Sequence, residues 1–360
     1  MKIVVFAGGV GTRLWPLSRK NTPKQFEKIV DNKSMLQISI AKVLPDFSWN
    51  DIYISTNAQY KDILKDQFPQ IPEENLIFEP CMRDVGPAVG LTIANFIKKL
   101  PKEEIAILWG DHLIKKEEEF RNALKTAGKL IEQDPQKIVF VGQKPRFASV
   151  NLGYIEFGDE IKKEEETSVY EFKAFKYRPD EQTANKFLED GKHAWNLGYF
   201  VTTPKFLWNM YEKFAPDLFG KLKQISDAVE TEDYEKVLNE VYPTIAKISF
   251  DNAILEKIDP SDGMVLSVDI GWSDIGAWEA LKEALAGTED ENVTKGNVEL
   301  VDSKDNLVFN YNGQLTVGID LEGMLVINMG DVLLVCPKSS VPKIKKYVEG
   351  LAGTPNEKLV

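Results

Sequence analysis

Three glycines and two cations near the start of the chain are suited to binding a polyphosphate. The glycines are Gly8, Gly9 and Gly11, and the cations are Arg13 and Lys24. A glycine backbone turns sharply and brings its N–H groups close to an anion, because no Cβ stands in the way. An unbroken apolar run at residues 3–7 precedes the loop and predicts a strand buried on both faces. The loop therefore falls at the carboxyl end of a strand, where α/β sheets bind phosphates. The alternative is a tight turn with two surface cations.

The residues of this loop exclude two common nucleotide-binding motifs. A Walker A loop needs Gly-Lys-Ser/Thr after the first glycine, and that sequence is missing. A dinucleotide fingerprint needs a third glycine at the position of Leu14. The loop therefore predicts another class of phosphate site.

Two acids follow predicted strands further along the chain. Asp111 comes after a strand expected at residues 105–109, and Asp274 after one expected at 264–268. Mg²⁺ prefers carboxylate oxygens and keeps substrate phosphates among its ligands. The pair can therefore hold one metal ion, whereas the alternative for each acid is to cap the next turn.

Composition limits the function further. The 360 residues, 43% of them hydrophobic, predict about two domains. A net charge of -12 argues against binding to nucleic acid through bulk charge, but not against a nucleotide substrate. The two cysteines are too far apart to form a metal-binding motif, and His193, in a polar run, is expected at the surface.

The sequence also gives expectations for cellular location. No signal peptide is expected, because a strand begins after a single lysine. No apolar run approaches the roughly 18 residues that a membrane span needs. We therefore expect a cytoplasmic protein that binds no membrane.

The order of elements predicts an α/β fold. Strands and helices alternate up to about residue 141, which is typical of a Rossmann-like mixed, mainly parallel sheet with helices on both faces. Strands at 154–157 and 168–175 are expected in an inserted antiparallel lobe. Short strands with turn residues between them follow a polar linker at 287–292. The predicted domains are 1–286 and a small C-terminal β domain at 287–360, whose apolar strands suggest a homodimer.

The full motif around the loop resembles the signature of a known family. Gly-Gly-Val-Gly-Thr-Arg-Leu-Trp-Pro-Leu-Ser-Arg spans residues 8–19, and Pro-Lys-Gln-Phe follows at 23–26. This string is similar to that of sugar-1-phosphate nucleotidyltransferases. The Leu-Trp-Pro-Leu-Ser-Arg and Pro-Lys-Gln-Phe portions look like the mannose-1-phosphate guanylyltransferase branch.

The resemblance implies a nucleotide site and a metal site. It assigns catalytic roles to Arg13, Lys24, Asp111 and Asp274, with the two acids holding Mg²⁺. It places the nucleotide against Ala7, Gly8, Gly9, Gly11, Thr12, Arg13, Lys24, Glu79, Arg83, Gly86, Pro87 and Asp111. The family has Asn-Thr-Ala where this chain has Asp84-Val85-Gly86, which leaves selection of the base open.

The resemblance also implies a site for the sugar phosphate. Its residues here are Gly153, Glu156, Arg178, Asn196 and Asp251. Asp251 has the alternative of an ordinary acid in the first turn of a helix. Two family positions differ in this chain, because Tyr177 replaces a glutamate and Leu197 replaces a serine. These changes leave the identity of the sugar open.

The reaction implied is the transfer of a guanylyl group from GTP to mannose 1-phosphate, giving GDP-mannose and pyrophosphate. His112 is expected only to position its neighbours, because a sugar phosphate is largely dianionic at neutral pH and needs no base. The alternatives are the same reaction with another sugar 1-phosphate or nucleoside triphosphate, and a non-catalytic regulatory subunit that binds a nucleotide sugar.

Overall fold

Packing divides the chain into two units, each with its own core. The computed structural model describes residues 1–9, 11–30 and 32–360, without the side chains of Thr12 and Val30. Unit 1 contains residues 1–8, 40–110 and 114–272. Unit 2 contains residues 9–39, 111–113 and 273–360. These units divide the chain differently from the predicted domains, because the glycine loop packs with the C-terminal strands. The predicted boundary at residue 286 stays a prediction.

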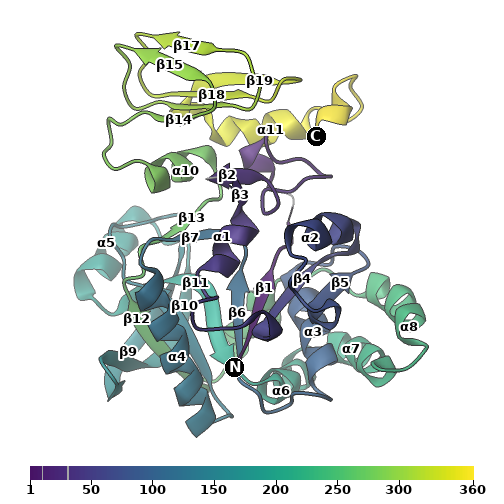
Figure 1. Ribbon diagram of the computed structural model, residues 1–360. Coiled ribbons are helices and arrows are strands. Elements are labelled where there is room, and N and C mark those ends of the chain that lie inside the picture. Colours follow the sequence, from purple (N-terminus) through teal and green to yellow (C-terminus); the bar gives the residue numbers. More distant parts are fainter. Residues whose placement is uncertain (10, 31) are drawn as a thin grey trace. The chain divides into compact units, whose positions relative to one another are not determined.

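A nine-stranded sheet forms the centre of unit 1 (Figure 1). Its strand order is β5-β4-β1-β6-β11-β8-β12-β10-β9. The strands are β1 (Lys2–Phe6), β4 (Ile52–Asn57), β5 (Leu76–Glu79), β6 (Ile105–Trp109), β8 (Ile138–Gln143), β9 (Gly153–Glu164), β10 (Thr167–Tyr177), β11 (His193–Thr202) and β12 (Gly263–Val268).

The sheet is mixed and mainly parallel, as predicted. Strand β1 pairs in parallel with both β4 and β6, and β12 pairs in parallel with β8. Strand β11 lies between β6 and β8 and is antiparallel to both. The apolar run of β1 is buried, as expected for a strand with neighbours on each side.

Helices cover both faces of this sheet. They are α2 (Lys61–Gln67), α3 (Val85–Phe96), α4 (Glu117–Gln133), α5 (Glu181–Asp190), α6 (Pro204–Phe214), α7 (Pro216–Ala228), α8 (Tyr234–Val241) and α9 (Phe250–Ala253). Short 3-10 turns are η2 (Trp49–Asp51), η3 (Ala58–Tyr60), η4 (Glu73–Asn75), η5 (Tyr242–Thr244), η6 (Leu255–Lys257) and η7 (Pro260–Asp262).

The contacts of two consecutive residues of β11 show that helices lie on opposite faces of the sheet. Successive side chains of a strand point to opposite sides of the sheet. The ring of Phe120 in α4 lies 5.7 Å from that of Tyr199, and the ring of Phe250 in α9 stacks 5.5 Å from that of Phe200. Helices α4 and α9 therefore lie against different faces.

Helix α3 is buried almost all round, as its composition predicts. It contributes Val89, Leu91 and Ile93 to a core that also contains Ile107 of β6. Asp84 is the N-cap of the helix, and its carboxylate accepts a hydrogen bond from the backbone N–H of Val85 at 2.7 Å. Its apolar faces are therefore explained by contacts with both the sheet and the outer helices.

The region expected as a separate antiparallel lobe belongs to the main sheet. Strands β9 and β10 form an antiparallel pair, but β10 also pairs with β12, and β9 also pairs with β11. The predicted antiparallel arrangement is therefore confirmed, but these strands extend the main sheet, and the prediction of an inserted lobe was wrong. The outer ends of β9 and β10 are exposed and form a solvated hairpin, whereas their inner ends carry buried residues such as Phe172.

Unit 2 contains short strands from both ends of the chain. They are β2 (Lys28–Val30), β3 (Lys33–Ser34), β14 (Val293–Lys295), β15 (Val298–Val301), β16 (Leu307–Asn310), β17 (Thr316–Ile319), β18 (Met324–Asn328) and β19 (Leu333–Pro337). Its helices and turns are α10 (Trp278–Leu285), α11 (Pro342–Glu349), η1 (Thr12–Leu14), η8 (Lys338–Ser340) and η9 (Glu357–Leu359). Strands β14, β16, β18 and β19 form one sheet, and β15 pairs with β17 (Figure 1).

The core of unit 2 joins the loop segment to the C-terminal strands. Leu14 and Trp15 pack in one cluster with Trp278, Phe309 and Ile344. The indole N–H of Trp278 donates to the carbonyl of Trp15 at 3.0 Å. The apolar half of the signature motif therefore serves packing within this unit.

Three elements fall where the chain passes between units: α1 (Met35–Ala41), β7 (His112–Ile114) and β13 (Trp272–Asp274). Helix α1 starts as its sequence predicts, because the Ser34 hydroxyl accepts from the N–H of Gln37 and the Gln37 side chain accepts from the N–H of Ser34. Strands β7 and β13 pair with each other.

Within the described residues, no helix is both long and apolar enough to cross a bilayer.

Glu79, at the end of β5, is a buried carboxyl. Only 7% of the residue is exposed, and its Oε2 accepts a hydrogen bond from the Tyr242 hydroxyl at 2.5 Å. Burial raises the pKa of Glu79 to about 7, although the Tyr242 hydrogen bond acts in the opposite direction. The folded protein therefore holds a proton that the unfolded chain releases at lower pH.

Glu79→Gln should remove part of the pH dependence of stability. Between a pH of about 4.5 and about 7 the folded state binds more protons at this site, so wild-type stability falls as pH rises. The free energy of unfolding of the variant relative to wild type should therefore increase by up to about 3 kcal/mol over this range, at roughly 1.4 kcal/mol per pKa unit. Urea unfolding of both proteins from pH 4.5 to 8 measures the difference. Glu118→Gln, at an exposed glutamate, is the control, and parallel curves for Glu79→Gln and wild type would contradict the assignment.

Candidate active site

The predicted site residues fall into groups that each lie within one unit. The phosphate-loop residues from Gly9 onward, together with Asp111 and Asp274, belong to unit 2. Ala7, Gly8 and the residues predicted for the base and the sugar belong to unit 1.

Lys24 is the central charge of the unit 2 group. The residue is only 7% exposed, and its Nζ lies 2.7 Å from Oδ2 of Asp111. The same ammonium donates to the carbonyl of Ile275 at 3.1 Å. Ile275 directly follows Asp274, so one lysine links the loop, Asp111 and the segment that carries the second acid. The loop cation and Asp111 therefore lie together within unit 2.

This environment keeps Asp111 ionised. Burial acts to raise the pKa of Asp111, but the charge of Lys24 and the neighbouring His112 outweigh it, and the pKa falls below its ordinary value. Nε2 of His112 lies 3.9 Å from Oδ1 of Asp111. Since Asp111 carries a full negative charge, it is an available ligand for a cation.

The side chain of Lys24 leaves no room for a Cβ at residue 11, so a glycine is required there. Its φ of +64° lies in the left-handed region, which most side chains avoid. A Cβ built at Gly11 would lie 2.8 Å from Cγ of Lys24. The glycine therefore permits both the turn and the passage of the lysine side chain beneath it. Gly9 also has a positive φ, of +98°.

Arg13 provides an exposed cation on the same loop. It lies in η1, and its charge lowers the pKa of Glu279, although burial of that glutamate has the larger effect and raises the pKa overall. An exposed guanidinium on a glycine loop is suited to bidentate contact with a phosphate. The side chain of Thr12, also predicted to contact the nucleotide, lies outside the described residues.

The loop before Asp274 is organised by a residue that sequence reasoning missed. Gln143, fully buried at the end of β8, donates to Oδ1 of Asp269 at 2.8 Å. Its Oε1 accepts from the backbone N–H of Ile270 at 3.0 Å and of Trp272 at 3.2 Å. These bonds order residues 269–272 within unit 1. A single glutamine at the end of an apolar strand gives no sequence signal for this role.

Asp111 and Asp274 each carry the type of oxygen ligand that suits a hard divalent cation whose other ligands are phosphates. Both acids are partly exposed, and Asp111 is ionised as described. Within the described residues, no group of three or more histidine, cysteine or acidic side chains gathers into a complete metal cage. Mg²⁺ suits such a site, because it is usually held by one or two carboxylates, with waters and substrate phosphates as further ligands.

The residues predicted for the nucleotide base make contacts inside unit 1. Glu79 bonds to Tyr242, as described above, and Arg83 donates to the carbonyl of Pro243. The N–H of Gly86 donates to the carbonyl of Ile248 at 3.0 Å, and a Cβ at Gly86 would lie 2.7 Å from that oxygen. Pro87 follows in the buried first turn of α3. These contacts hold α3 and β5 to the segment at 242–248, and base binding stays a prediction.

The residues predicted for the sugar gather around a side chain that departs from the family pattern. Tyr177 ends β10 opposite Gly153 of β9. Its hydroxyl donates to Oδ1 of Asp251 at 2.5 Å and is also hydrogen-bonded by the Asn196 side chain. Three of the five predicted sugar residues therefore meet at Tyr177. Sequence reasoning noted the substitution at this position but not this role.

The other two sugar residues lie on strand β9 and directly after strand β10. Glu156 of β9 forms an ion pair with Lys176 at 3.0 Å. Arg178 directly follows Tyr177, is exposed, and has a φ of +45°, which is uncommon for a residue with a Cβ. Backbone outliers of this kind occur often at ligand sites, where the surrounding structure holds them.

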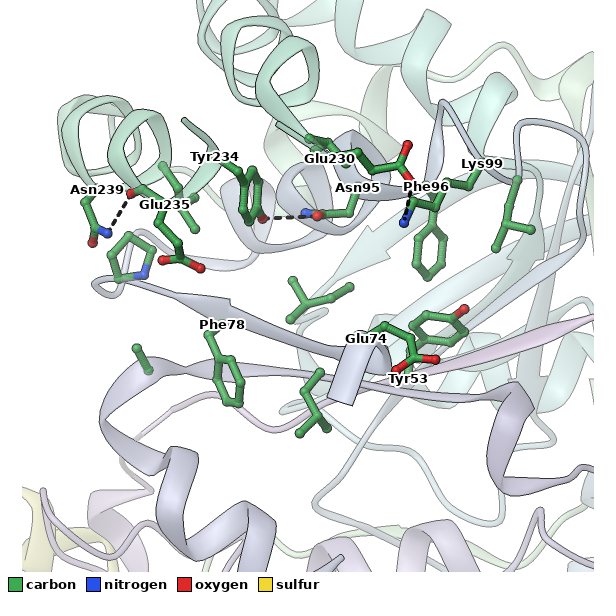
Figure 2. A pocket seen from close by; sticks show the side chains of 17 residues that line it. Tyr53, Glu74, Phe78, Asn95, Phe96, Lys99, Glu230, Tyr234, Glu235 and Asn239 are labelled. Carbon is green, nitrogen blue, oxygen red and sulfur yellow. Dashed lines mark hydrogen bonds and ion pairs between the residues drawn. The ribbon is translucent and has the colours of Figure 1, made fainter. Parts of the chain in front are cut away.

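A hollow of about 440 Å³ lies elsewhere in unit 1, beside β5, α3 and α8 (Figure 2). Its lining combines aromatic rings such as Phe78 and Phe96 with the carboxylates of Glu74, Glu230 and Glu235. The residues that line it include none of those predicted for the site. Its acidic groups would repel a triphosphate, so this hollow does not compete with the loop as a nucleotide site.

Comparison with known proteins identifies the family of this chain. Residues 2–291 match the family model described as nucleotidyl transferase. A mannose-1-phosphate guanylyltransferase 2 from Escherichia coli is 33% identical over 356 residues, which cover 97% of this chain and 73% of the relative. A mannose-1-phosphate guanylyltransferase, also from Escherichia coli, is 30% identical over 351 residues, covering 96% of this chain and 72% of the relative.

A solved structure has the same fold over nearly the whole chain. It is described as a mannose-1-phosphate geranyltransferase from Thermus thermophilus. Its TM-score is 0.85 at 26% sequence identity, and the match covers 97% of this chain and 98% of that one. The family model, the sequence relatives and this fold agree, and the chain belongs to the nucleotidyl transferase family, among relatives named mannose-1-phosphate guanylyltransferase.

Proposed function

We propose that this protein transfers a guanylyl group from GTP to mannose 1-phosphate, giving GDP-mannose and pyrophosphate. An oxygen of the sugar phosphate attacks the α-phosphorus in line, and pyrophosphate leaves without a covalent enzyme intermediate. The observation that carries the proposal is the Lys24–Asp111 pair beneath the glycine loop, in a chain whose relatives are named for this activity.

The reaction brings two polyanions together, so charge neutralisation and alignment are the main tasks of the protein. Lys24 and Arg13 supply the positive charge at the triphosphate, and the glycine backbone supplies N–H donors. Lys24 is already held in place by Asp111 and the carbonyl of Ile275. It therefore needs little reorganisation when the nucleotide binds.

Mg²⁺ is the metal that best fits this donor set, with Asp111 and Asp274 as its protein ligands. When bound, it supplies positive charge at the phosphate oxygens on which negative charge builds up. The two acids would contribute the fixed negative charge that holds this cation. On the sugar side, Asn196 and Asp251 offer hydrogen-bonding groups for hydroxyls, and Arg178 offers a guanidinium for the acceptor phosphate.

Turnover with defined substrates tests this proposal. Pyrophosphate release should be fastest with GTP and mannose 1-phosphate in a panel of four nucleoside triphosphates and several sugar 1-phosphates. It should stop on adding EDTA and return with excess Mg²⁺. Faster turnover of another pair would assign a different sugar or base, whereas no turnover with any pair would favour a non-catalytic subunit that binds a nucleotide sugar.

A pair of variants tests the role of the buried ion pair. Lys24→Met should lower turnover more than roughly 100-fold, because it removes a preorganised cation. It should also destabilise the fold by about 3–5 kcal/mol, because Asp111 then keeps a charge without its partner. Lys24→Met combined with Asp111→Asn should recover part of that stability, measured by urea unfolding, while turnover stays lost. Near-normal turnover in either variant would contradict the roles assigned here.

We also infer a homodimer built through unit 2. Strands β15, β17 and β19 and the turn before β17 expose a set of large apolar side chains, each 48–61% exposed: Val301, Leu315, Val317, Ile319, Leu333 and Val335. Such a set of exposed apolar side chains within one small unit is typical of a surface that is covered by another chain. Strand β19 is also an edge of its sheet, so its backbone can pair with a second copy.

Sedimentation measures the mass of the assembly and therefore tests the proposed homodimer directly. Wild type should sediment at twice the 40.7 kDa of one chain, and Val317→Glu with Ile319→Glu should shift it to the mass of one chain. Ile161→Glu, which changes an equally exposed isoleucine in unit 1, is the matched control and should leave the mass unchanged. A wild type at the mass of one chain would reject the dimer.

A further inference from the structure

Tyr177 is the centre of a polar cluster on unit 1. Its hydroxyl donates to Oδ1 of Asp251 at 2.5 Å and is hydrogen-bonded by the Asn196 side chain. The Oδ1 of Asn196 in turn accepts from the backbone N–H of Gly198 at 2.9 Å. The amide group of Asn196 is thereby oriented so that its NH₂ group faces the phenol oxygen. A chain of hydrogen bonds therefore runs from the backbone of β11 through Tyr177 to the carboxylate of Asp251.

The ring of Tyr177 is also held in place. A Cβ at Gly153, its partner across β9 and β10, would lie 3.2 and 3.3 Å from two of its ring carbons. The ring of Phe175 stacks on it at 6.1 Å with an interplanar angle of 25°. Gly153 therefore admits the ring, and Phe175 supports it.

The cluster remains accessible although its members are fixed. Tyr177 is 41% exposed, and Asn196 and Asp251 are each partly exposed. Burial of the hydroxyl and the charge of Asp251 raise the pKa of Tyr177, so the phenol stays protonated and donates at any ordinary pH. A protonated phenol occupies one oxygen of Asp251 and leaves the other to accept from a ligand.

We propose that Tyr177 is a positioning residue that sets the sugar specificity of this enzyme by fixing the Asp251 carboxylate. A carboxylate in one orientation accepts only from hydroxyls that point toward its second oxygen. Epimers differ in the direction of a single hydroxyl, so a fixed acceptor distinguishes them better than a rotating one. This inference rests on the proposed sugar-phosphate substrate.

The kinetics of Tyr177→Phe test the proposal. The variant keeps the ring but loses the bond to Asp251. KM for mannose 1-phosphate should rise roughly tenfold, as expected for a lost hydrogen bond to a charged group. KM for GTP and kcat should change little. The ratio of kcat/KM for mannose 1-phosphate to that for glucose 1-phosphate should also fall several-fold. A purely structural role would alter thermal stability or kcat without altering this ratio.

Two further variants complete the test. Tyr170→Phe removes a hydroxyl from the same strand, away from the cluster, and should leave every kinetic constant unchanged. Tyr177→Phe combined with Asp251→Asn should have the same sugar KM as Asp251→Asn alone, because Tyr177 acts through that carboxylate.

The outcomes separate this inference from the proposed function. If wild type makes GDP-mannose but Tyr177→Phe keeps its sugar KM and its preference between epimers, the role of Tyr177 is wrong and the function stands. Additive effects of the two substitutions would also overturn it. If wild type releases no pyrophosphate with any sugar 1-phosphate, the proposed function and this inference fail together.

Discussion

A buried lysine that must be paired is the constraint on which unit 2 depends. Lys24 is almost completely buried, and an ammonium in that position is stable only with an opposing charge and hydrogen-bond acceptors. Asp111 and the carbonyl of Ile275 supply them, from segments about 90 and 250 residues away along the chain. The need to neutralise one charge therefore brings together the loop and the segments that carry both acids. The same arrangement leaves a cation that is buried and held in place, so that it needs little reorganisation to act on the phosphates proposed as its ligands.

The strands that the sequence predicts well are those whose residues all obey one simple pattern. Strand β6 matches its predicted bounds at residues 105–109, because it is a continuous apolar run bordered by turns. Strand β11 was not predicted, although it lies in the middle of the sheet. Asn196 and Gly198 interrupt its apolar pattern at a bulge, and Gly198 has a φ of +69° with Nε1 of Trp109 only 2.3 Å from the place of a Cβ. Local pattern cannot reveal a strand whose irregularity is imposed by a side chain nearly 90 residues away.

The sequence alone also does not distinguish, within one motif, the residues that pack in the core from those that bind a ligand. The signature around Arg13 predicted a phosphate site, but its Leu14 and Trp15 are core residues of unit 2. The C-terminal tail shows the same dependence on distant partners, since the Leu359 carbonyl accepts from the indole of Trp15 at 2.7 Å. His193 was likewise expected at the surface but is 6% exposed, because Phe187 stacks on its ring at 3.8 Å. In each case the deciding contact comes from a side chain that composition alone does not identify.

The substitution at Tyr177 changes what this position contributes to the cluster. A phenol at this position carries no charge near neutral pH, so it is a weaker acceptor for hydroxyls than a glutamate. It can, however, hold the carboxylate of Asp251, and Gly153 leaves the space that its larger ring requires. The cluster therefore keeps the carboxylate of Asp251, at a position where the resemblance also implies an acid, while the acid that the family has at residue 177 is lost. The motif alone records that lost acid, whereas the hydrogen bonds indicate that the residue now present orients the acid that remains. The sugar specificity proposed for this site thus depends on the cluster as a whole, and no single position of the motif determines it.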